Sequence, residues 1–180
     1  MKTDDTMEKR YPKTLSQGAN NTVIALSSTE VAKLFTEDTR SDIGSEAEKM
    51  KYANQINTLV VKFMRLDLDE AKKWEMLVME RLYPLDFRTY EYEARVLQMD
   101  VFEEELKQLH EGGFVHRDIR RPSSEAGEVF DNIFLTEQGI RLIDVGISAT
   151  RSTVGEKLFS LYVDQEKEEL AAFRSYYLSR

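Results

Sequence analysis

One segment, residues 114–146, constrains the fold of this chain more than any other. It begins F-V-H-R-D-I-R-R-P and, after an insert, continues with D-N-I-F-L and G-I-R-L-I-D-V-G. Two short apolar runs lie in it, Ile133–Leu135 and Ile140–Ile143, and the polar turn Glu137–Gly139 separates them. Short apolar runs bounded by turn residues are typical of strands, so this part of the chain predicts a β-hairpin.

Three polar residues in this segment lie outside the two runs. Asp118 follows His116 and Arg117, Asn132 precedes the hairpin, and Asp144 follows it. In this order they resemble the catalytic loop H-R-D-x-x-x-x-N and the metal site D-F-G of the protein kinase superfamily. The motifs are those of the eukaryotic-type serine/threonine kinases.

The resemblance implies an enzyme that transfers the γ-phosphate of ATP to a hydroxyl group, with Mg²⁺ as the metal. It extends from about residue 15 to residue 146. In its short length the chain is similar to minimal kinases, namely the short bacterial effector kinases and the RIO-type and archaeal-type small kinases. The fold this implies is α+β: a kinase-like bilobal fold with a mainly antiparallel N-lobe sheet and a truncated helical C-lobe.

The expected organisation is a mobile leader at residues 1–13 followed by one minimal kinase-like domain at residues 14–180. Its N-lobe would span about 14–80, its hinge about 80–84 and its reduced C-lobe about 85–180. Apolar residues recur at helical spacing in three segments: Ser45–Ile56, Thr89–Glu111 and Leu158–Leu178. Strand patterns occupy Leu15–Ala25, Glu30–Phe35, Leu59–Leu68 and Trp74–Leu82.

The resemblance assigns roles to four residues around the insert. Asp118 would accept or orient the proton of the substrate hydroxyl. Arg120 stands where serine/threonine kinases carry a lysine that meets the γ-phosphate, and it keeps that charge. Asn132 and Asp144 would hold the Mg²⁺ ions.

A lysine–glutamate pair is a further expectation. Val31-Ala32-Lys33 resembles the strand lysine motif V-A-I-K, whose lysine contacts phosphates and pairs with a helix glutamate. An ammonium group in an apolar strand also needs a partner on physical grounds, because its burial is costly. The glutamate is expected to be Glu46, with Glu48 as the alternative.

The nucleotide is expected to contact both lobes. Only one glycine of the family's glycine-rich loop is present, Gly18 in the segment S-Q-G-A-N-N-T-V. The V-M-E-R-L segment resembles the hinge, with a methionine gatekeeper and backbone groups for the adenine edge. The full set of expected nucleotide contacts is Gly18, Val23, Ala32, Lys33, Met79, Glu80, Leu82 and Phe134.

The chain departs from the family pattern in three further places. Asn132 lies fourteen positions after Asp118 instead of five, and the extra residues fall in an insert at 123–130. Because loop closure costs grow slowly with length, this insert need not disturb Asp118 or Asn132, and its ends can still meet. Val145 replaces the phenylalanine of D-F-G. No A-P-E sequence follows, so control by activation-loop phosphorylation, which Arg117 would read, is not expected.

Composition excludes some classes of function. The net charge of −8 argues against nucleic acid or an anionic membrane as partner. No run approaches about 18 apolar residues, so no membrane span is expected. With no cysteine there is neither a disulfide nor a thiolate metal site. No signal peptide is evident, which predicts a cytoplasmic protein, or one delivered to a host cytosol as an effector.

Three functions remain open at this stage. The first is a minimal serine/threonine protein kinase, with a protein substrate and an activating protein partner. The second is a small-molecule kinase of the same fold. The third is a nucleotide-binding pseudokinase that serves as an interaction module. The third is disfavoured, because a binding module has no chemical need for all four of Lys33, Asp118, Asn132 and Asp144.

Overall fold

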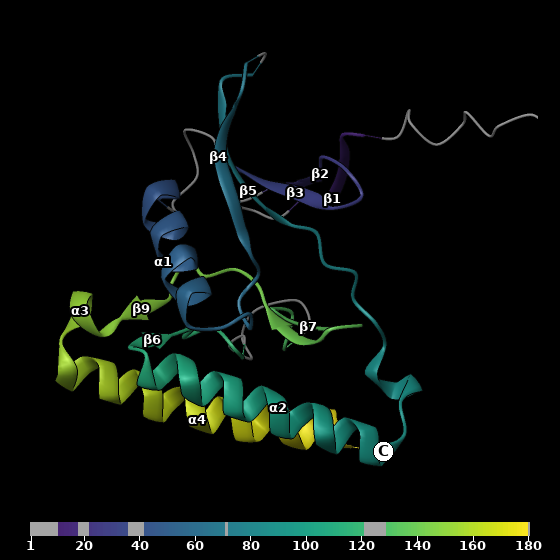
Figure 1. Ribbon diagram of the computed structural model, residues 1–180, viewed down its shortest axis with the longest axis vertical. Coiled ribbons are helices and arrows are strands. Elements are labelled where there is room, and N and C mark those ends of the chain that lie inside the picture. Colours follow the sequence, from purple (N-terminus) through teal and green to yellow (C-terminus); the bar gives the residue numbers. More distant parts are fainter. Residues whose placement is uncertain (1–10, 18–21, 36–41, 71, 121–128, 180) are drawn as a thin grey trace, which may run out of the picture. The chain divides into compact units, whose positions relative to one another are not determined.

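The computed structural model describes residues 11–17, 22–35, 42–70, 72–120 and 129–179 (Figure 1). These residues form an α+β fold with a five-stranded antiparallel sheet, two small two-stranded sheets and four α-helices, which confirms the predicted class. The chain divides into two units. The first contains the described residues up to Ala47 together with Phe63–Arg81, and the second contains Glu48–Lys62 and the residues from Leu82 onward.

The first unit is built on the five-stranded sheet, in the order β1-β2-β3-β5-β4. The strands are β1 (Lys13–Gln17), β2 (Thr22–Ala25), β3 (Glu30–Phe35), β4 (Phe63–Asp69) and β5 (Trp74–Glu80). A polar turn joins β2 to β3, where the Ser27 hydroxyl accepts hydrogen bonds from the backbone N–H groups of Thr29 and Glu30. Lys13 already belongs to β1, so the part of the predicted leader that the structure describes includes the start of a strand.

The two faces of this sheet carry different residues. Ala32, Leu34, Met76 and Val78 form one buried apolar cluster. Lys33 stands between Ala32 and Leu34 in β3 and pairs in register with Val23 and Leu77, so these three residues share the opposite face. The alternation of side chains along a strand therefore separates Lys33 from Ala32.

Residues Leu59–Val61 are not part of β4, contrary to the expected strand at Leu59–Leu68. They belong to the second unit, where Val60 forms a parallel bridge with Leu142. The backbone N–H of Leu142 donates to the carbonyl of Leu59, and the N–H of Val61 donates to the carbonyl of Leu142, each at 2.8 Å. All three residues are almost completely buried.

Helix α1 (Ile43–Ile56) contributes residues to both units. It begins two residues before the expected Ser45. Ala47, Met50 and Ala53 have no exposed surface, as their three-residue spacing predicts.

The second unit rests on two long helices, α2 (Tyr92–Glu111) and α4 (Glu156–Tyr177), which lie side by side (Figure 1). Phe102 of α2 meets Phe173 of α4 edge to face, with ring centroids 5.6 Å apart. Gly113 has φ +87°, a left-handed conformation that suits glycine, and it lies just beyond α2, which ends at the expected Glu111. The expected helix start at Thr89 is too early, because Phe87–Thr89 form the 3₁₀-helix η1.

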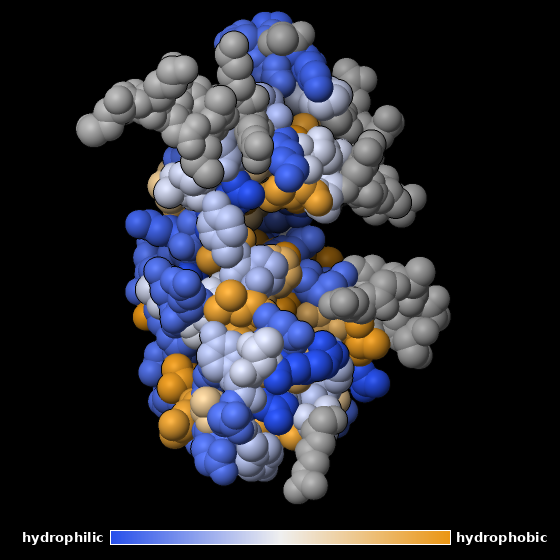
Figure 2. Space-filling model, turned by 90° about the vertical axis from the view of Figure 1, so that its right-hand side faces the viewer, coloured by the Kyte–Doolittle hydropathy of each residue, from blue (hydrophilic) through white to orange (hydrophobic). Residues whose placement is uncertain are grey.

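Short elements complete the second unit. The predicted hairpin is confirmed as β7 (Ile133–Thr136) and β8 (Gly139–Leu142). β6 (Phe114–Val115) pairs with β9 (Ala149–Thr150), and α3 (Arg151–Val154) leads into α4. Apolar residues on the face shown in Figure 2 lie in patches among hydrophilic ones. Within the described residues, no helix combines the length and the apolar character needed to cross a membrane.

Candidate active site

Asp118 and Asn132 lie in direct contact in the second unit. The side-chain nitrogen of Asn132 donates to the carboxylate Oδ2 of Asp118 at 2.9 Å and to its backbone carbonyl at 3.0 Å. Both residues are half-buried. Asp118 and Asn132 are thus in contact although the insert separates them in the sequence; residues 121–128 lie outside the described part of the chain.

Backbone contacts of Ile143 bring Asp144 next to this pair. The N–H of Ile143 donates to the carbonyl of Asn132, and Nε2 of the fully buried His116 lies 2.9 Å from the carbonyl of Ile143. Because a carbonyl oxygen only accepts, Nε2 of His116 must carry the proton. Asp144 itself has φ +57°, and its Oδ1 accepts from the N–H of Gly146. Asp118, Asn132 and Asp144 therefore form one polar cluster.

Burial is the largest influence on the carboxyl group of Asp118. It raises the pKa of Asp118, and the negative charges of Asp144 and Asp131 act in the same direction. His116 and the hydrogen bond from Asn132 oppose this rise. Asp118 is thus a carboxylate whose charged form is disfavoured in the folded protein.

This shift predicts that Asp118→Asn stabilises the protein at neutral pH. The folded-state pKa lies above the ordinary value of 3.8, so the folded state holds the proton more tightly, and stability falls as pH rises between the two values. Asparagine keeps an acceptor for Asn132 but carries no charge. Denaturant titrations should show a larger free energy of unfolding for the variant at pH 7 and no difference below pH 3.8. The exposed control Asp164→Asn should leave the free energy of unfolding unchanged. A lower free energy of unfolding for Asp118→Asn at pH 7 would contradict this prediction.

Helix α4 supplies two glutamates that hold the backbone on either side of Asp118. The side chain of Glu166 has 0% exposure, and its Oε2 accepts from the N–H of Arg117 at 2.5 Å. Its Oε1 lies 2.9 Å from Nε2 of His110 on α2. Glu169 accepts from the N–H of Arg120 at 3.3 Å, and burial raises the pKa of Glu169. Arg120 itself is exposed.

Neither glutamate is among the site residues predicted from the sequence, although the sequence contains one signal for Glu166. Phe159, Glu166 and Phe173 are seven residues apart and therefore lie on one face of α4, which is buried at all three positions. A glutamate within such an apolar stripe indicates a partner that satisfies its charge.

Lys33 and Glu46 form a buried ion pair in the first unit. Nζ of Lys33 lies 2.7 Å from Oε1 of Glu46, and the two side chains are 5% and 2% exposed. The alternative partner Glu48 instead pairs with Lys51 on the surface. Of the two glutamates left open by the sequence, Glu46 is the one that contacts Lys33.

The expected nucleotide contacts fall into separate groups. Val23 shares the face of Lys33, and so do Val31 and Met79, which pair with each other in register. Ala32 does not belong to this set, because it is completely buried in the cluster on the opposite face. Val31 takes its place, as strand alternation alone could have indicated. Gly18 lies outside the described residues.

The expected hinge begins at the end of β5. Glu80 is the last residue of β5 and pairs in register with Glu30. Arg81 ends the first unit and Leu82 begins the second, inside the predicted hinge at 80–84. The expected lobe boundaries differ from the two units at residues 48–62, which belong to the second unit.

No family model matches this chain, and no curated protein does.

Phe134 of β7 lines a groove of about 590 Å³ in the second unit. The groove walls are mainly apolar and aromatic, and they include Phe87, Phe130, Phe173 and Tyr176. Asp131 and Ile133, the neighbours of Asn132, also line it. The groove is therefore next to the polar cluster of Asp118, Asn132 and Asp144, because Asn132 stands between two residues that line it.

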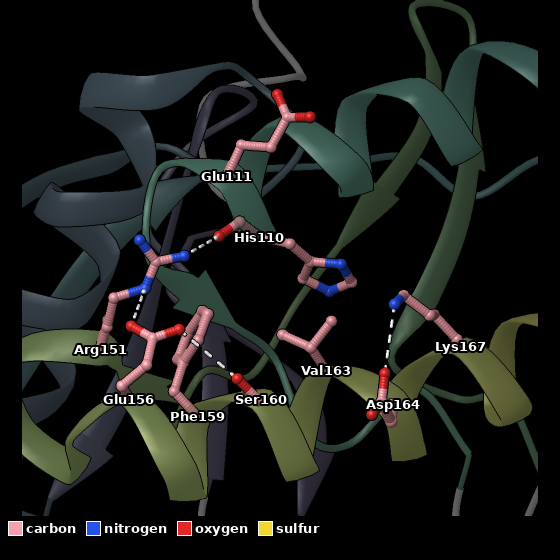
Figure 3. Close-up of a pocket in the computed structure, with 9 residues that line it drawn as sticks. All are labelled: His110, Glu111, Arg151, Glu156, Phe159, Ser160, Val163, Asp164 and Lys167. Carbon is pink, nitrogen blue, oxygen red and sulfur yellow. Dashed lines mark hydrogen bonds and ion pairs between the residues drawn. The ribbon is translucent and has the colours of Figure 1, made fainter.

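A smaller hollow of about 250 Å³ lies where the end of α2 meets α3 and α4 (Figure 3). Four of its charged side chains form pairs: Arg151 with Glu156 at 3.3 Å and Lys167 with Asp164 at 3.2 Å. None of the residues expected at the active site lines it. His110 connects it to the site, because the His110 ring also contacts Glu166.

The donor set of the polar cluster fits Mg²⁺. Asn132 uses its amide nitrogen for both hydrogen bonds to Asp118, and its amide oxygen is the type of ligand that Mg²⁺ prefers. Asp144 adds a carboxylate. Among the described residues no group of three or more His, Cys, Asp or Glu side chains could hold a metal ion by itself. Mg²⁺ commonly takes one or two protein ligands and completes its shell with phosphate oxygens and water, so these two residues suffice.

Proposed function

We propose that this protein is an ATP-dependent phosphotransferase, a minimal serine/threonine protein kinase with a kinase-like bilobal fold. The contact between Asn132 and Asp118 is the observation that carries the proposal, since it joins residues fourteen positions apart. Ile143 adds Asp144 to the same cluster. Phosphoryl transfer uses an acid–base group for the acceptor hydroxyl close to the oxygen ligands that hold the metal ion.

Each residue has a role in this proposal. Asp118 orients the acceptor hydroxyl and receives its proton, while Arg120 offers positive charge near the transferred group. Asn132 and Asp144 hold Mg²⁺. The proposed phosphate contact in the first unit is Lys33, fixed by Glu46. The residues assigned to the base are Val23, Val31, Met79 and Glu80 in the first unit and Leu82 and Phe134 in the second. Bound ATP with Mg²⁺ supplies the phosphoryl group and neutralises its charge. The proposed setting is a cytosol, with an activating protein partner.

A small-molecule kinase is the second candidate. The groove beside Asn132 has the volume and the apolar lining of small-molecule sites, which span about 300–1,000 Å³. Arg117 favours a protein acceptor, because small-molecule kinases of this fold often lack the arginine of H-R-D. Both candidates use the same residues for the chemical step.

Binding of ATP is predicted to depend on Mg²⁺ through Asp144 and Asn132. At a hundredfold excess of nucleotide over its dissociation constant, the stabilisation should be about 2.7 kcal/mol. Thermal unfolding with ATP should therefore show a clear upward shift with Mg²⁺ and a much smaller one with EDTA. The Asp144→Ala variant should lose the Mg²⁺-dependent part, and Asp86→Ala, an exposed carboxylate of the same unit, should retain it. An identical shift in Asp144→Ala would exclude Asp144 as a metal ligand.

Incubation with γ-labelled ATP and Mg²⁺ distinguishes the candidate functions. A protein kinase should label itself or a generic protein acceptor, whereas a small-molecule kinase should label only low-molecular-weight hydroxyl compounds. Nucleotide-induced stabilisation without transfer to any acceptor would indicate a binding module instead.

A further inference from the structure

Arg117, the residue directly before Asp118, is held in an unusual backbone conformation. Its φ is +70°, a left-handed value that is uncommon for residues other than glycine and asparagine. Such a conformation persists only where the surroundings enforce it. The contacts that fix Arg117 therefore decide where the chain places Asp118.

The side chain of Arg117 is fixed by an aromatic ring of α4. Its guanidinium carbon lies 3.8 Å from the ring centroid of Tyr162, and its Nη1 donates to the carbonyl of Ile147 at 2.9 Å. A planar guanidinium stacks on the face of a tyrosine through electrostatic attraction to the ring and dispersion. This contact requires no negatively charged partner.

Tyr162 is itself held firmly. It packs against the buried cluster of Val115, Ala149 and Phe159. It also stands one helical turn before Glu166, which accepts the backbone N–H of Arg117. One face of α4 therefore holds both the side chain and the backbone of Arg117.

We propose that Tyr162 is a positioning residue, whose ring holds Arg117 and thereby the backbone that carries Asp118. This inference rests on the proposed phosphotransferase function and adds its mode of control. In the resemblance described above, Arg117 would read a phosphorylated residue. Here the ring occupies the guanidinium instead, so the loop is set without phosphorylation of the protein.

Three variants test the role of the ring. Tyr162→Leu removes the aromatic face, Tyr162→Phe keeps it, and Leu161→Ala changes an exposed neighbour on the same helix. The first readout is amide hydrogen exchange of the peptide spanning residues 115–120, which needs no enzymatic activity. The second is kcat and KM for ATP in the presence of an acceptor.

Exchange in residues 115–120 should rise in Tyr162→Leu and match the unmodified protein in the other two variants. The kcat of Tyr162→Leu should fall roughly 2- to 30-fold, the range that corresponds to loss of one cation–π contact, while its KM for ATP stays unchanged. Tyr162→Phe should keep the amide exchange and the kcat of the unmodified protein. If Tyr162→Leu fails to fold, Arg117→Gln removes the same contact from the other side and should raise the same exchange.

Unchanged exchange in Tyr162→Leu or Arg117→Gln would overturn the inference, whatever the activity. Loss of protection in Tyr162→Phe would overturn it as well, because the hydroxyl and not the ring would then be responsible. Absence of transfer by the unmodified protein would instead refute the proposed function, and the exchange measurement would still decide whether Tyr162 positions the loop.

Discussion

Replacing Asp118 with alanine is expected to lower turnover about 100-fold or more, the usual cost of losing a positioned acid–base group. ATP affinity should remain nearly unchanged, because Asn132 and Asp144 supply the proposed metal ligands. The measurement is kcat and the dissociation constant for ATP with Mg²⁺, determined on the same preparations.

Asp131→Asn is the matched control for this variant. Asp131 is a neighbouring carboxylate whose charge acts on Asp118, but it has no proposed role in the reaction. Its replacement should change turnover by only a few fold. Equal losses in the two variants would show that the general negative charge of the site matters, and not Asp118 in particular.

Replacing Lys33 with methionine should have the largest effect on stability. The Lys33–Glu46 pair is buried, and removal of one partner from such a pair typically costs about 3–5 kcal/mol, because the other charge stays in the interior. Turnover should fall as well, since the proposed phosphate contact is lost. Denaturant unfolding and steady-state kinetics measure the two effects separately.

The double variant Lys33→Met/Glu46→Leu separates the two roles of this pair. Apolar residues of similar volume often replace a buried ion pair at little cost, so stability should largely return while turnover stays low. The exposed pair of Lys51 and Glu48 is the control, and Lys51→Met should cost less than about 1 kcal/mol. Return of turnover together with stability would assign a purely structural role to Lys33.

The features predicted correctly from the sequence are mainly those with a local cause. The β7–β8 hairpin follows from two apolar runs around a turn, and the end of α2 follows from Gly112 and Gly113. The spacing of Ala47, Met50 and Ala53 indicates the buried side of α1. The choice of Glu46 over Glu48 follows from the same spacing, because Glu46 adjoins the buried face.

Features that depend on a distant partner could not be predicted in this way. Leu59–Val61 continues an apolar run toward β4, and nothing local reveals its pairing with Leu142, more than 80 residues further along the chain. Tyr162 and Glu169 look like ordinary helix residues until α4 is packed beside the loop of Asp118. β6 and β9 have two residues each, too few to form a recognisable pattern.

Ala32 is a different case, because the sequence alone could have corrected it. Neighbouring residues in a strand point to opposite faces, so Ala32 and Lys33 cannot both face one ligand. Val31 is the residue that alternation places beside Lys33, and the register of β3 with β5 agrees.

A single-turnover experiment measures transfer of the γ-phosphate itself. The protein is saturated with γ-labelled ATP and Mg²⁺, mixed with a protein acceptor and quenched at increasing times, in parallel with Asp118→Asn at equal nucleotide occupancy. Labelled acceptor and ADP should form together in the unmodified protein, and the rate of their formation should be at least about 100-fold lower in the variant. Full nucleotide occupancy without labelled protein or labelled small-molecule hydroxyl compound would contradict this prediction, and so would equal rates in the two proteins.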